Sequence, residues 1–253
     1  MTTIPRPRWA QPATDLTGRT LLVLGGTGGV GEGVVTAALH LGATVVATGR
    51  TPERLDDLSR SVDDANLHVE PLDALAPGLT GRAAEFAERY GSFDGVIISI
   101  ASWGGGDRKP ALSLTDEEWD ELIAVNLTAV FRLFRAFHPH VRPDGLLLQL
   151  NGMSADIPFP GAGGVALSAA ATKSLTRTLA AESADQGPRY YQVILGLIRT
   201  RQREAAGTSG PGNVSPTDVG WHVAELVAAT SPHTSADLHY LLDPATGPRS
   251  EAA

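Results

Sequence analysis

The chain has 253 residues and a formal net charge of −8, and 42% of its residues are hydrophobic. This length suffices for one large α/β domain or two small ones, while acidic residues spread along the chain disfavour nucleic acid or an anionic membrane as a partner. The chain has no cysteine and no apolar run near the roughly 18 residues of a membrane helix, so we expect a cytoplasmic protein with no metal site.

The first predicted strand leads directly into a glycine-rich turn. Residues 1–19 contain several prolines and predict an N-terminal arm; the apolar run Leu21–Leu24 then predicts a buried strand. Six glycines follow between positions 25 and 33, and a helical segment runs from about Gly31 to His40. Glycine lets backbone N–H groups and a helix N-terminus approach a diphosphate. We therefore predict a dinucleotide site here, with these cofactor-binding residues: Gly25, Thr27, Gly28, Gly29, Val30 and Gly31.

The spacing of these glycines is ambiguous. Gly26, Gly28 and Gly31 fit G-x-G-x-x-G, and replacing Gly26 by Gly25 gives G-x-x-G-x-x-G. Gly25, Gly29 and Gly31 fit G-x-x-x-G-x-G. No Lys-Ser or Lys-Thr pair follows, which excludes a P-loop. The turn alone does not choose among dinucleotide-binding families.

The next two strand ends carry candidate contacts for the adenosine half of the cofactor. The predicted strand Ala43–Thr48 ends before Arg50, about 20 residues beyond the glycine turn, where such folds read the ribose. A cation there suits the 2′-phosphate of NADP; the alternative is an ordinary surface arginine, with NAD as the cofactor. The predicted strand Leu67–Leu72 ends at Asp73, which suits either the adenine amino group or a helix cap.

Helices and strands alternate through the rest of the chain. Predicted helices cover residues 51–62, 81–90, 115–138, 165–184 and 217–227, and predicted strands cover residues 95–100, 145–150, 190–196 and 238–242. A polar segment, 198–214, has the composition of a lid, and residues 246–253 predict a C-terminal tail. The alternation predicts a single-domain doubly wound parallel sheet over residues 20–245, a Rossmann fold with helices on both faces.

Two residues stand out within this pattern. Trp103 opens the glycine-rich loop 103–107 after a strand, where it either walls a ligand pocket or simply packs. Asn126 lies in mid-helix among apolar residues, and an amide there is unfavourable unless it finds hydrogen-bond partners.

Several of these segments together resemble the short-chain dehydrogenase/reductase family over nearly the whole chain. The glycines at 25, 29 and 31 are similar to its T-G-x-x-x-G-x-G turn, and residues 94–102, DGVIISIAS, to its D-G-V-L-V-N-N-A-G strand. Residues 175–182, LTRTLAAE, resemble L-T-R-x-L-A-x-E, and residues 196–200, GLIRT, resemble P-G-x-I-x-T.

The resemblance implies roles for particular residues. Ala101 would line the cofactor site, while the Ile198 backbone and the Thr200 hydroxyl would contact the nicotinamide amide. Lys173 would hold the nicotinamide ribose, and Asn126 would support a water-linked proton relay to it. The helices that carry these last two residues pack partner subunits in the family, which implies a homodimer or homotetramer.

The family's catalytic signature is incomplete. Its Y-x-x-x-K pattern retains Lys173 but has Ala169 in place of the tyrosine, and the catalytic serine position falls within residues 152–154. One positioned acid–base group contributes about 10²–10⁴-fold to a rate. Ser154 and Asp156 are candidate substitutes for it, with solvated loop residues as the alternative interpretation.

The sequence thus predicts an atypical NADP-linked oxidoreductase that transfers hydride to or from a small carbonyl or alcohol substrate. The alternative is a non-redox member of the same fold, such as a pseudoenzyme, a ligand-binding regulator, a cyclase or an isomerase, which keeps the nucleotide site.

Overall fold

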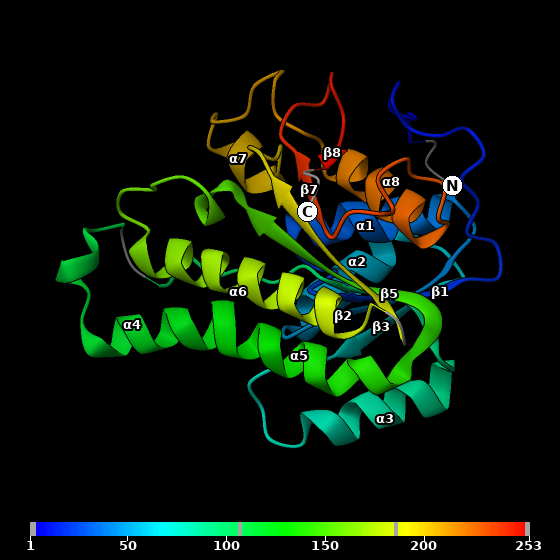
Figure 1. The fold of residues 1–253 in the computed structure, drawn as a ribbon, viewed down its shortest axis with the longest axis horizontal. Coiled ribbons are helices and arrows are strands. Elements are labelled where there is room, and N and C mark those ends of the chain that lie inside the picture. The colour runs from blue at the N-terminus through cyan, green and yellow to red at the C-terminus, as the bar shows by residue number, and fades with distance from the viewer. Residues whose placement is uncertain (1–3, 106–107, 185–186, 251–253) are drawn as a thin grey trace.

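An eight-stranded sheet forms the centre of the molecule (Figure 1). The computed structural model describes residues 4–105, 108–184 and 187–250. The strand order is β3-β2-β1-β4-β5-β6-β7-β8, and all neighbours pair in parallel except β7 and β8. The strands are β1 (Thr20–Leu24), β2 (Thr44–Gly49), β3 (Leu67–Pro71), β4 (Phe93–Ile98), β5 (Val141–Gly152), β6 (Arg189–Leu195), β7 (Leu238–Leu241) and β8 (Arg249–Ser250). The predicted doubly wound Rossmann fold is confirmed.

Helices cover both faces of the sheet, because alternate strand residues point to opposite sides. Leu21 and Val23 of β1 face α1, α2 and α8, whereas Leu22 and Leu24 face α3, α5 and α6. The helices are α1 (Gly29–His40), α2 (Pro52–Val62), α3 (Leu79–Tyr90), α4 (Asp116–Ile123), α5 (Ala129–Phe137), α6 (Gly163–Glu182), α7 (Arg201–Ala205) and α8 (Pro216–Val227). Among the described residues, no helix is both long and apolar enough to cross a membrane.

Several element boundaries differ from the sequence-based prediction. The helix expected over residues 115–138 contains one π-helical turn, Ala124–Thr128, between α4 and α5. The strand expected from Gly145 starts at Val141, because residues between them bulge out of the pairing of β5 with β4. The segment expected to be an irregular lid contains α7.

The expected N-terminal arm and C-terminal tail are packed together. The indole Nε1 of Trp9 donates to the carbonyl of Pro244 at 3.2 Å, and a Cβ on Gly247 would lie 2.4 Å from the same ring. Gln11 donates its N–H to Glu225 on α8, and Ile4 is buried. Tail residues Arg249–Ser250 form β8 against β7, and residues 1–3 and 251–253 lie outside the described part of the chain.

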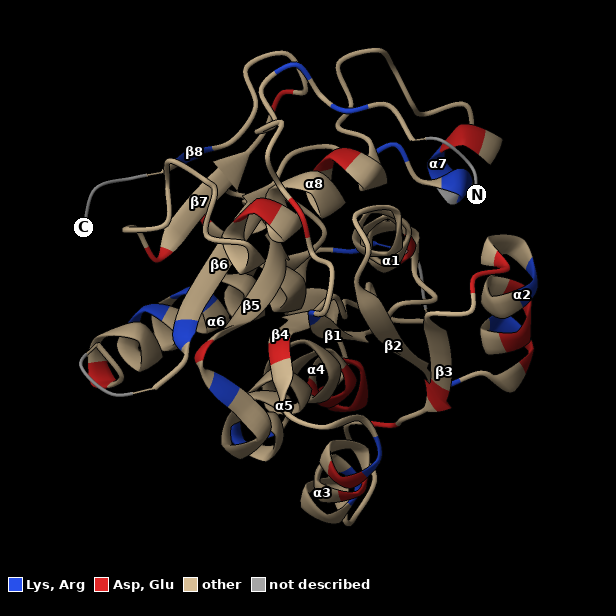
Figure 2. Ribbon diagram, turned by 90° about the vertical axis from the view of Figure 1, so that its right-hand side faces the viewer, with Lys and Arg blue, Asp and Glu red and all other residues tan. Residues whose placement is uncertain are grey.

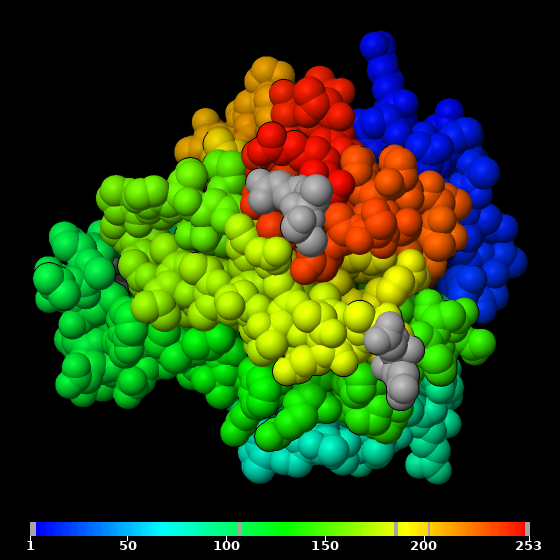
Figure 3. Space-filling view, viewed as in Figure 1, coloured from blue at the N-terminus to red at the C-terminus, as the bar shows by residue number. Residues whose placement is uncertain are grey.

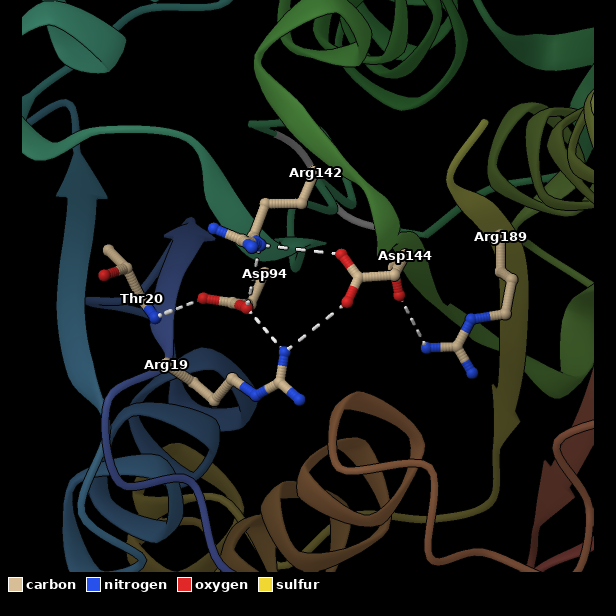
Figure 4. Close-up of polar contacts among 6 residues, drawn as sticks. All are labelled: Arg19, Thr20, Asp94, Arg142, Asp144 and Arg189. Carbon is tan, nitrogen blue, oxygen red and sulfur yellow. Dashed lines mark hydrogen bonds and ion pairs between the residues drawn. The ribbon is translucent and has the colours of Figure 1, made fainter. Parts of the chain in front are cut away.

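Charged side chains lie on the outer helices, in loops and at strand ends (Figure 2). One group ties the amino ends of the central strands together (Figure 4). The carboxylate of Asp94, on β4, accepts from the backbone N–H of Thr20 at 2.8 Å and from Arg19 at 2.7 Å. Arg142 lies 3.6 Å from the same carboxylate and 3.5 Å from Asp144. This network lies at the edge of the sheet opposite to the glycine turn.

Candidate functional site

The turn between β1 and α1 is too crowded for side chains at four of its glycines, Gly25, Gly26, Gly29 and Gly31. Gly25 has a φ of +89°, and a Cβ there would lie 2.4 Å from the carbonyl oxygen of Ser99. A Cβ on Gly29 would lie 2.9 Å from the methyl group of Thr200, and one on Gly31 would lie 2.2 Å from the carbonyl oxygen of Gly25. Gly28 has no such contact closer than 3.4 Å. Of the three possible spacings, only G-x-x-x-G-x-G consists entirely of positions that exclude a side chain.

The N-terminus of α1 presents backbone donors at this turn. Gly28 is the N-cap and offers no side chain to cap the helix, and the N–H of Glu32 donates to the Gly28 carbonyl at 2.8 Å. The amides of Gly29, Val30 and Gly31 precede that bond, so the helix itself provides no acceptor for them. Together with the positive end of the helix dipole, they suit an anion such as a diphosphate.

A cleft of about 180 Å³ opens beside this turn, at the carboxyl ends of the first four strands. It lies where the chain order reverses between β1 and β4, the usual ligand position in doubly wound sheets. Its lining comprises Leu24, Gly25, Thr27, Gly28, Thr48, Gly49, Arg50, Thr51, Arg54, Leu72, Asp73, Ala74, Leu75, Ser99, Ile100, Ala101, Val125, Ala129 and Leu133.

Two arginines line the cleft at the end of β2. Arg50 was expected here from the sequence, and Arg54, one turn into α2, was not. Thr51 caps this helix only through its backbone, since its side chain makes no capping hydrogen bond. The spacing of Arg54 from the strand end, just inside a helix opened by Pro52, is the sequence signal that could have identified it.

Asp73 also lines the cleft, after β3. Its Oδ1 accepts from the N–H of Leu75 at 2.9 Å. Asp73 therefore shapes the local turn while standing beside the space where adenine was expected.

Asn126 fastens the loop after β4. Its Oδ1 accepts from the N–H of Ser102 at 2.8 Å, and its Nδ2 donates to the carbonyls of Ser102 and Leu122, both at 2.9 Å. The buried amide is thus satisfied on both its oxygen and its nitrogen. The preceding residue of that loop, Ala101, lines the cleft.

The segment after β6 lies directly against the glycine turn. Ile198 is buried and pairs with Val214, and the hydroxyl of Thr200 accepts from the N–H of Arg203 at the start of α7. The methyl group of Thr200 faces Gly29. The segment that carries Ile198 and Thr200, the two predicted nicotinamide contacts, therefore lies beside the predicted diphosphate position.

Lys173 lies elsewhere. Its Nζ forms an ion pair with Asp156 and lies 3.2 Å from the hydroxyl of Tyr240 on β7. Neither Lys173 nor Asp156 lines the cleft; both line a second hollow on the α6 side of the sheet. α6 begins at the carboxyl edge of the sheet with Gly163, so Lys173 is about 15 Å further along its axis. The water-linked relay expected between Asn126 and Lys173 stays a prediction.

The surroundings of Lys173 and Tyr240 keep both of these side chains protonated at neutral pH. Burial opposes the charge on Lys173, but hydrogen bonds to Asp156 and Tyr240 outweigh it and raise the pKa of the ammonium group. Burial also raises the pKa of the Tyr240 phenol, although Lys173 acts in the opposite direction. Tyr240 is separated from Lys173 by 67 residues, so no local pattern could have revealed it.

Ser154 and Ala169 complete the comparison with the expected catalytic residues. Ser154 lies in the 3₁₀ turn Met153–Ala155, beside the hollow that Met153 lines. Ala169 is 6% exposed, and its carbonyl accepts from the side chain of Asn151 on β5. The position expected to lack the phenol is therefore buried.

Trp103 belongs to an aromatic cluster rather than standing alone. Its ring lies 5.8 Å from that of Phe159, and the Arg108 guanidinium lies 4.3 Å above it. Trp103 remains 49% exposed and does not line the cleft; residues 106–107 of its predicted loop lie outside the described part of the chain. No group of His, Asp or Glu side chains suited to a metal ion occurs among the described residues.

These features define a dinucleotide-binding fold, and comparisons with known proteins identify its family. The family model described as enoyl-(acyl carrier protein) reductase matches residues 25–230. The chain is 30% identical over 190 residues to 3β-hydroxysteroid dehydrogenase 1 of Eggerthella lenta, covering 74% of this chain and 73% of that protein. The chain belongs to the short-chain dehydrogenase/reductase family.

Two solved structures illustrate the similarity. A short-chain dehydrogenase from Pseudomonas syringae has a TM-score of 0.76 and 26% identity, covering 86% of this chain and 92% of that one. An NADPH-bound short-chain oxidoreductase from Pseudomonas aeruginosa, described as containing an atypical catalytic center, has a TM-score of 0.74 and 23% identity, covering 86% and 92%.

Proposed function

We propose that the protein is an NADP-dependent oxidoreductase with an atypical active site, acting on a small carbonyl or alcohol substrate. The observation that carries the proposal is the pairing of free backbone amides at the start of α1 with two arginines in the cleft beside that turn. The amides suit the diphosphate and the arginines suit a further phosphate on the adenosine ribose. Membership of a family with dehydrogenases among its named proteins supports redox chemistry.

The residues present fit the cofactor along its length. The crowded glycines let a diphosphate approach the amides of Gly29, Val30 and Gly31. Arg50 and Arg54 would hold the 2′-phosphate, and Asp73 and Ala101 would flank the adenosine half. The backbone of Ile198 and the hydroxyl of Thr200 would orient the nicotinamide, although that hydroxyl already accepts from Arg203.

NADP supplies the hydride donor or acceptor when bound, and the protein must manage the accompanying proton. The first two turns of α6, residues 163–170, contain neither tyrosine nor lysine. Lys173 and Asp156 neutralise each other in the second hollow. We therefore assign the proton to the substrate, to water or to a loop residue such as Ser154, and expect slow turnover with unactivated carbonyls.

The decisive experiment combines binding with turnover. Calorimetric titration should show NADP binding more tightly than NAD, and NADPH absorbance should fall in the presence of at least one member of a carbonyl panel. If NADPH binds and is never consumed, the protein is instead a non-redox member of the fold. If neither nucleotide binds, the proposal as a whole is wrong.

We also propose a homodimer or homotetramer formed through the helices that carry Asn126 and Lys173. Phe131 on α5 is 44% exposed and Leu167 on α6 is 47% exposed, so both outer surfaces present an apolar side chain. Light scattering coupled to size-exclusion chromatography tests the assembly: the Phe131→Glu variant should be monomeric, and a monomeric unmodified protein would contradict it.

A further inference from the structure

The second hollow has a volume of about 340 Å³ and lies between α6 and the C-terminal strands. Figure 3 shows the C-terminal segment beside α6 on this face of the molecule. The volume of the hollow is within the range of small-molecule sites. It is lined by Met153, Asp156, Ile157, Lys173, Ile194, Tyr240, Leu242 and Arg249.

Strand register builds the floor of this hollow. Ile194 on β6 pairs with Tyr240 on β7, and Tyr240 pairs with Arg249 on β8. Directly paired residues project from the same face of a sheet, so these three side chains form one row. The guanidinium of Arg249 lies 5.3 Å from the centre of the Tyr240 ring.

The polar groups of the hollow have an excess of positive charge. Lys173 and Arg249 are cations, and Asp156 neutralises one of them through its ion pair with Lys173. An ammonium group can only donate hydrogen bonds, so the Tyr240 oxygen accepts from Lys173 and the phenolic proton is left to donate, with the Asp156 carboxylate as its acceptor within the protein. The polar side of the hollow therefore combines a guanidinium with a phenol held by an ammonium group.

The remaining walls are apolar. Ile194 is fully buried at the floor, and Ile157 is 47% exposed at the rim. Met153 and Leu242 complete these walls. Cationic and phenolic donors beside aliphatic walls are complementary to an organic anion with an apolar body.

We propose that this hollow binds a small carboxylic acid, with its carboxylate between Arg249 and Tyr240 and its hydrocarbon part against Ile157 and Ile194. A carboxylate accepts two hydrogen bonds from a planar guanidinium group and a further one from a phenol. The site is distinct from the nucleotide cleft, because the two share no lining residue. The proposal of a carboxylic-acid site is therefore independent of whether NADP binds.

Three probes of equal chain length isolate the charge that the hollow selects. Hexanoate, hexanamide and hexylamine are titrated into the nucleotide-free protein, with binding followed by saturation-transfer NMR and calorimetry. Hexanoate should bind, hexanamide should bind at least about tenfold more weakly, and hexylamine should not bind.

Variants locate the binding. Arg249→Gln and Tyr240→Phe should each weaken hexanoate binding by about tenfold, whereas Arg60→Gln, on the outer surface of α2, should leave it unchanged. Thermal unfolding of each variant shows that it is folded, and Arg249→Lys, which keeps the charge, should retain most of the affinity. Absence of hexanoate binding, equal binding of hexanamide, or binding indifferent to Arg249 and Tyr240 overturns the proposal. Added NADP should not displace hexanoate; displacement would show that the hollow is not a separate site.

Discussion

The Nε2 of His222, on α8, lies 3.0 Å from the Nδ1 of His239, on β7, and both residues are fully buried. His239 donates from its Nε2 to the carbonyl of Ala236 at 2.8 Å, so its Nδ1 accepts from His222. The Nδ1 of His222 then faces the interior without a hydrogen-bond partner among the described residues. Burial, with His239 and His233 nearby, holds the pKa of His222 well below its ordinary value, and burial also lowers that of His239.

This pair predicts a protein that loses stability in mild acid. The unfolded chain binds more protons than the folded one below a pH of about 6.5, so stability is complete above that value and falls as the pH decreases. The free energy of unfolding, measured by urea titration from pH 8 to pH 5, should decline by up to about 1.4 kcal/mol per pH unit for each histidine. His222→Phe should flatten this slope, and a slope unchanged in that variant would contradict the assignment.

Two glycines of the β1–α1 turn should respond differently to the same substitution. Gly28→Ala has room for a methyl group, so thermal stability should change little, while the methyl intrudes on the diphosphate position and weakens NADP binding. Gly31→Ala places a Cβ against the Gly25 carbonyl and should lower the unfolding temperature as well. Calorimetric binding and thermal melts distinguish the two, and unchanged affinity in Gly28→Ala would argue against the assigned cofactor position.

Arg50→Gln and Arg54→Gln should each reduce NADP affinity by about tenfold and alter NAD affinity little, because only NADP carries the 2′-phosphate. Arg60→Gln is a matched control, since its side chain pairs with Asp57 on the surface of α2. Titration of both nucleotides into all three variants measures the ratio of NADP affinity to NAD affinity. Equal losses for NAD and NADP would place the arginines somewhere other than at the phosphate.

The network of Figure 4 should depend mainly on one carboxylate. Asp94 has a side chain only 8% exposed and accepts from two donors, so Asp94→Ala should cost about 1–3 kcal/mol of unfolding free energy. Asp144→Ala should cost less than about 1 kcal/mol, because that side chain is 67% exposed. Urea unfolding of both variants provides the comparison, and equal losses would contradict it.

A tyrosine placed at position 169 should not produce a family-type active site. Ala169 is buried, so the phenol of Ala169→Tyr would overpack the interior and destabilise the protein by about 1–3 kcal/mol. We expect a lower unfolding temperature and no gain in NADPH consumption. A stable Ala169→Tyr protein with increased turnover would show that this position does face the substrate.

Sequence patterns were most informative where the relevant structure is local. The strand–glycine–helix order located the turn, and the end of a β-branched strand located Arg50, because backbone and side chain there are set by neighbours in sequence. Arg54 was missed although it lies only one turn further on, since a charged residue in a surface helix has many ordinary explanations.

Contacts between distant segments could not be predicted in this way. A Y-x-x-x-K pattern identifies a lysine but not the direction of its side chain, which here is determined by Asp156 and Tyr240 from separate segments. The bulge in β5 and the two-residue β8 are likewise products of neighbouring strands, because residues 142–144 and 249–250 have little strand character of their own.

Contact of Trp9 with Pro244 and Gly247 joins regions at opposite ends of the polypeptide. Each region supplies the surface on which the other is ordered, and α8 contacts the N-terminal arm through Glu225. Opening of either end removes buried area from the other, so the two should exchange their amide protons as a single cooperative unit. This contact would delay fraying of the β7–β8 edge of the sheet, whereas removal of one terminus would loosen the other.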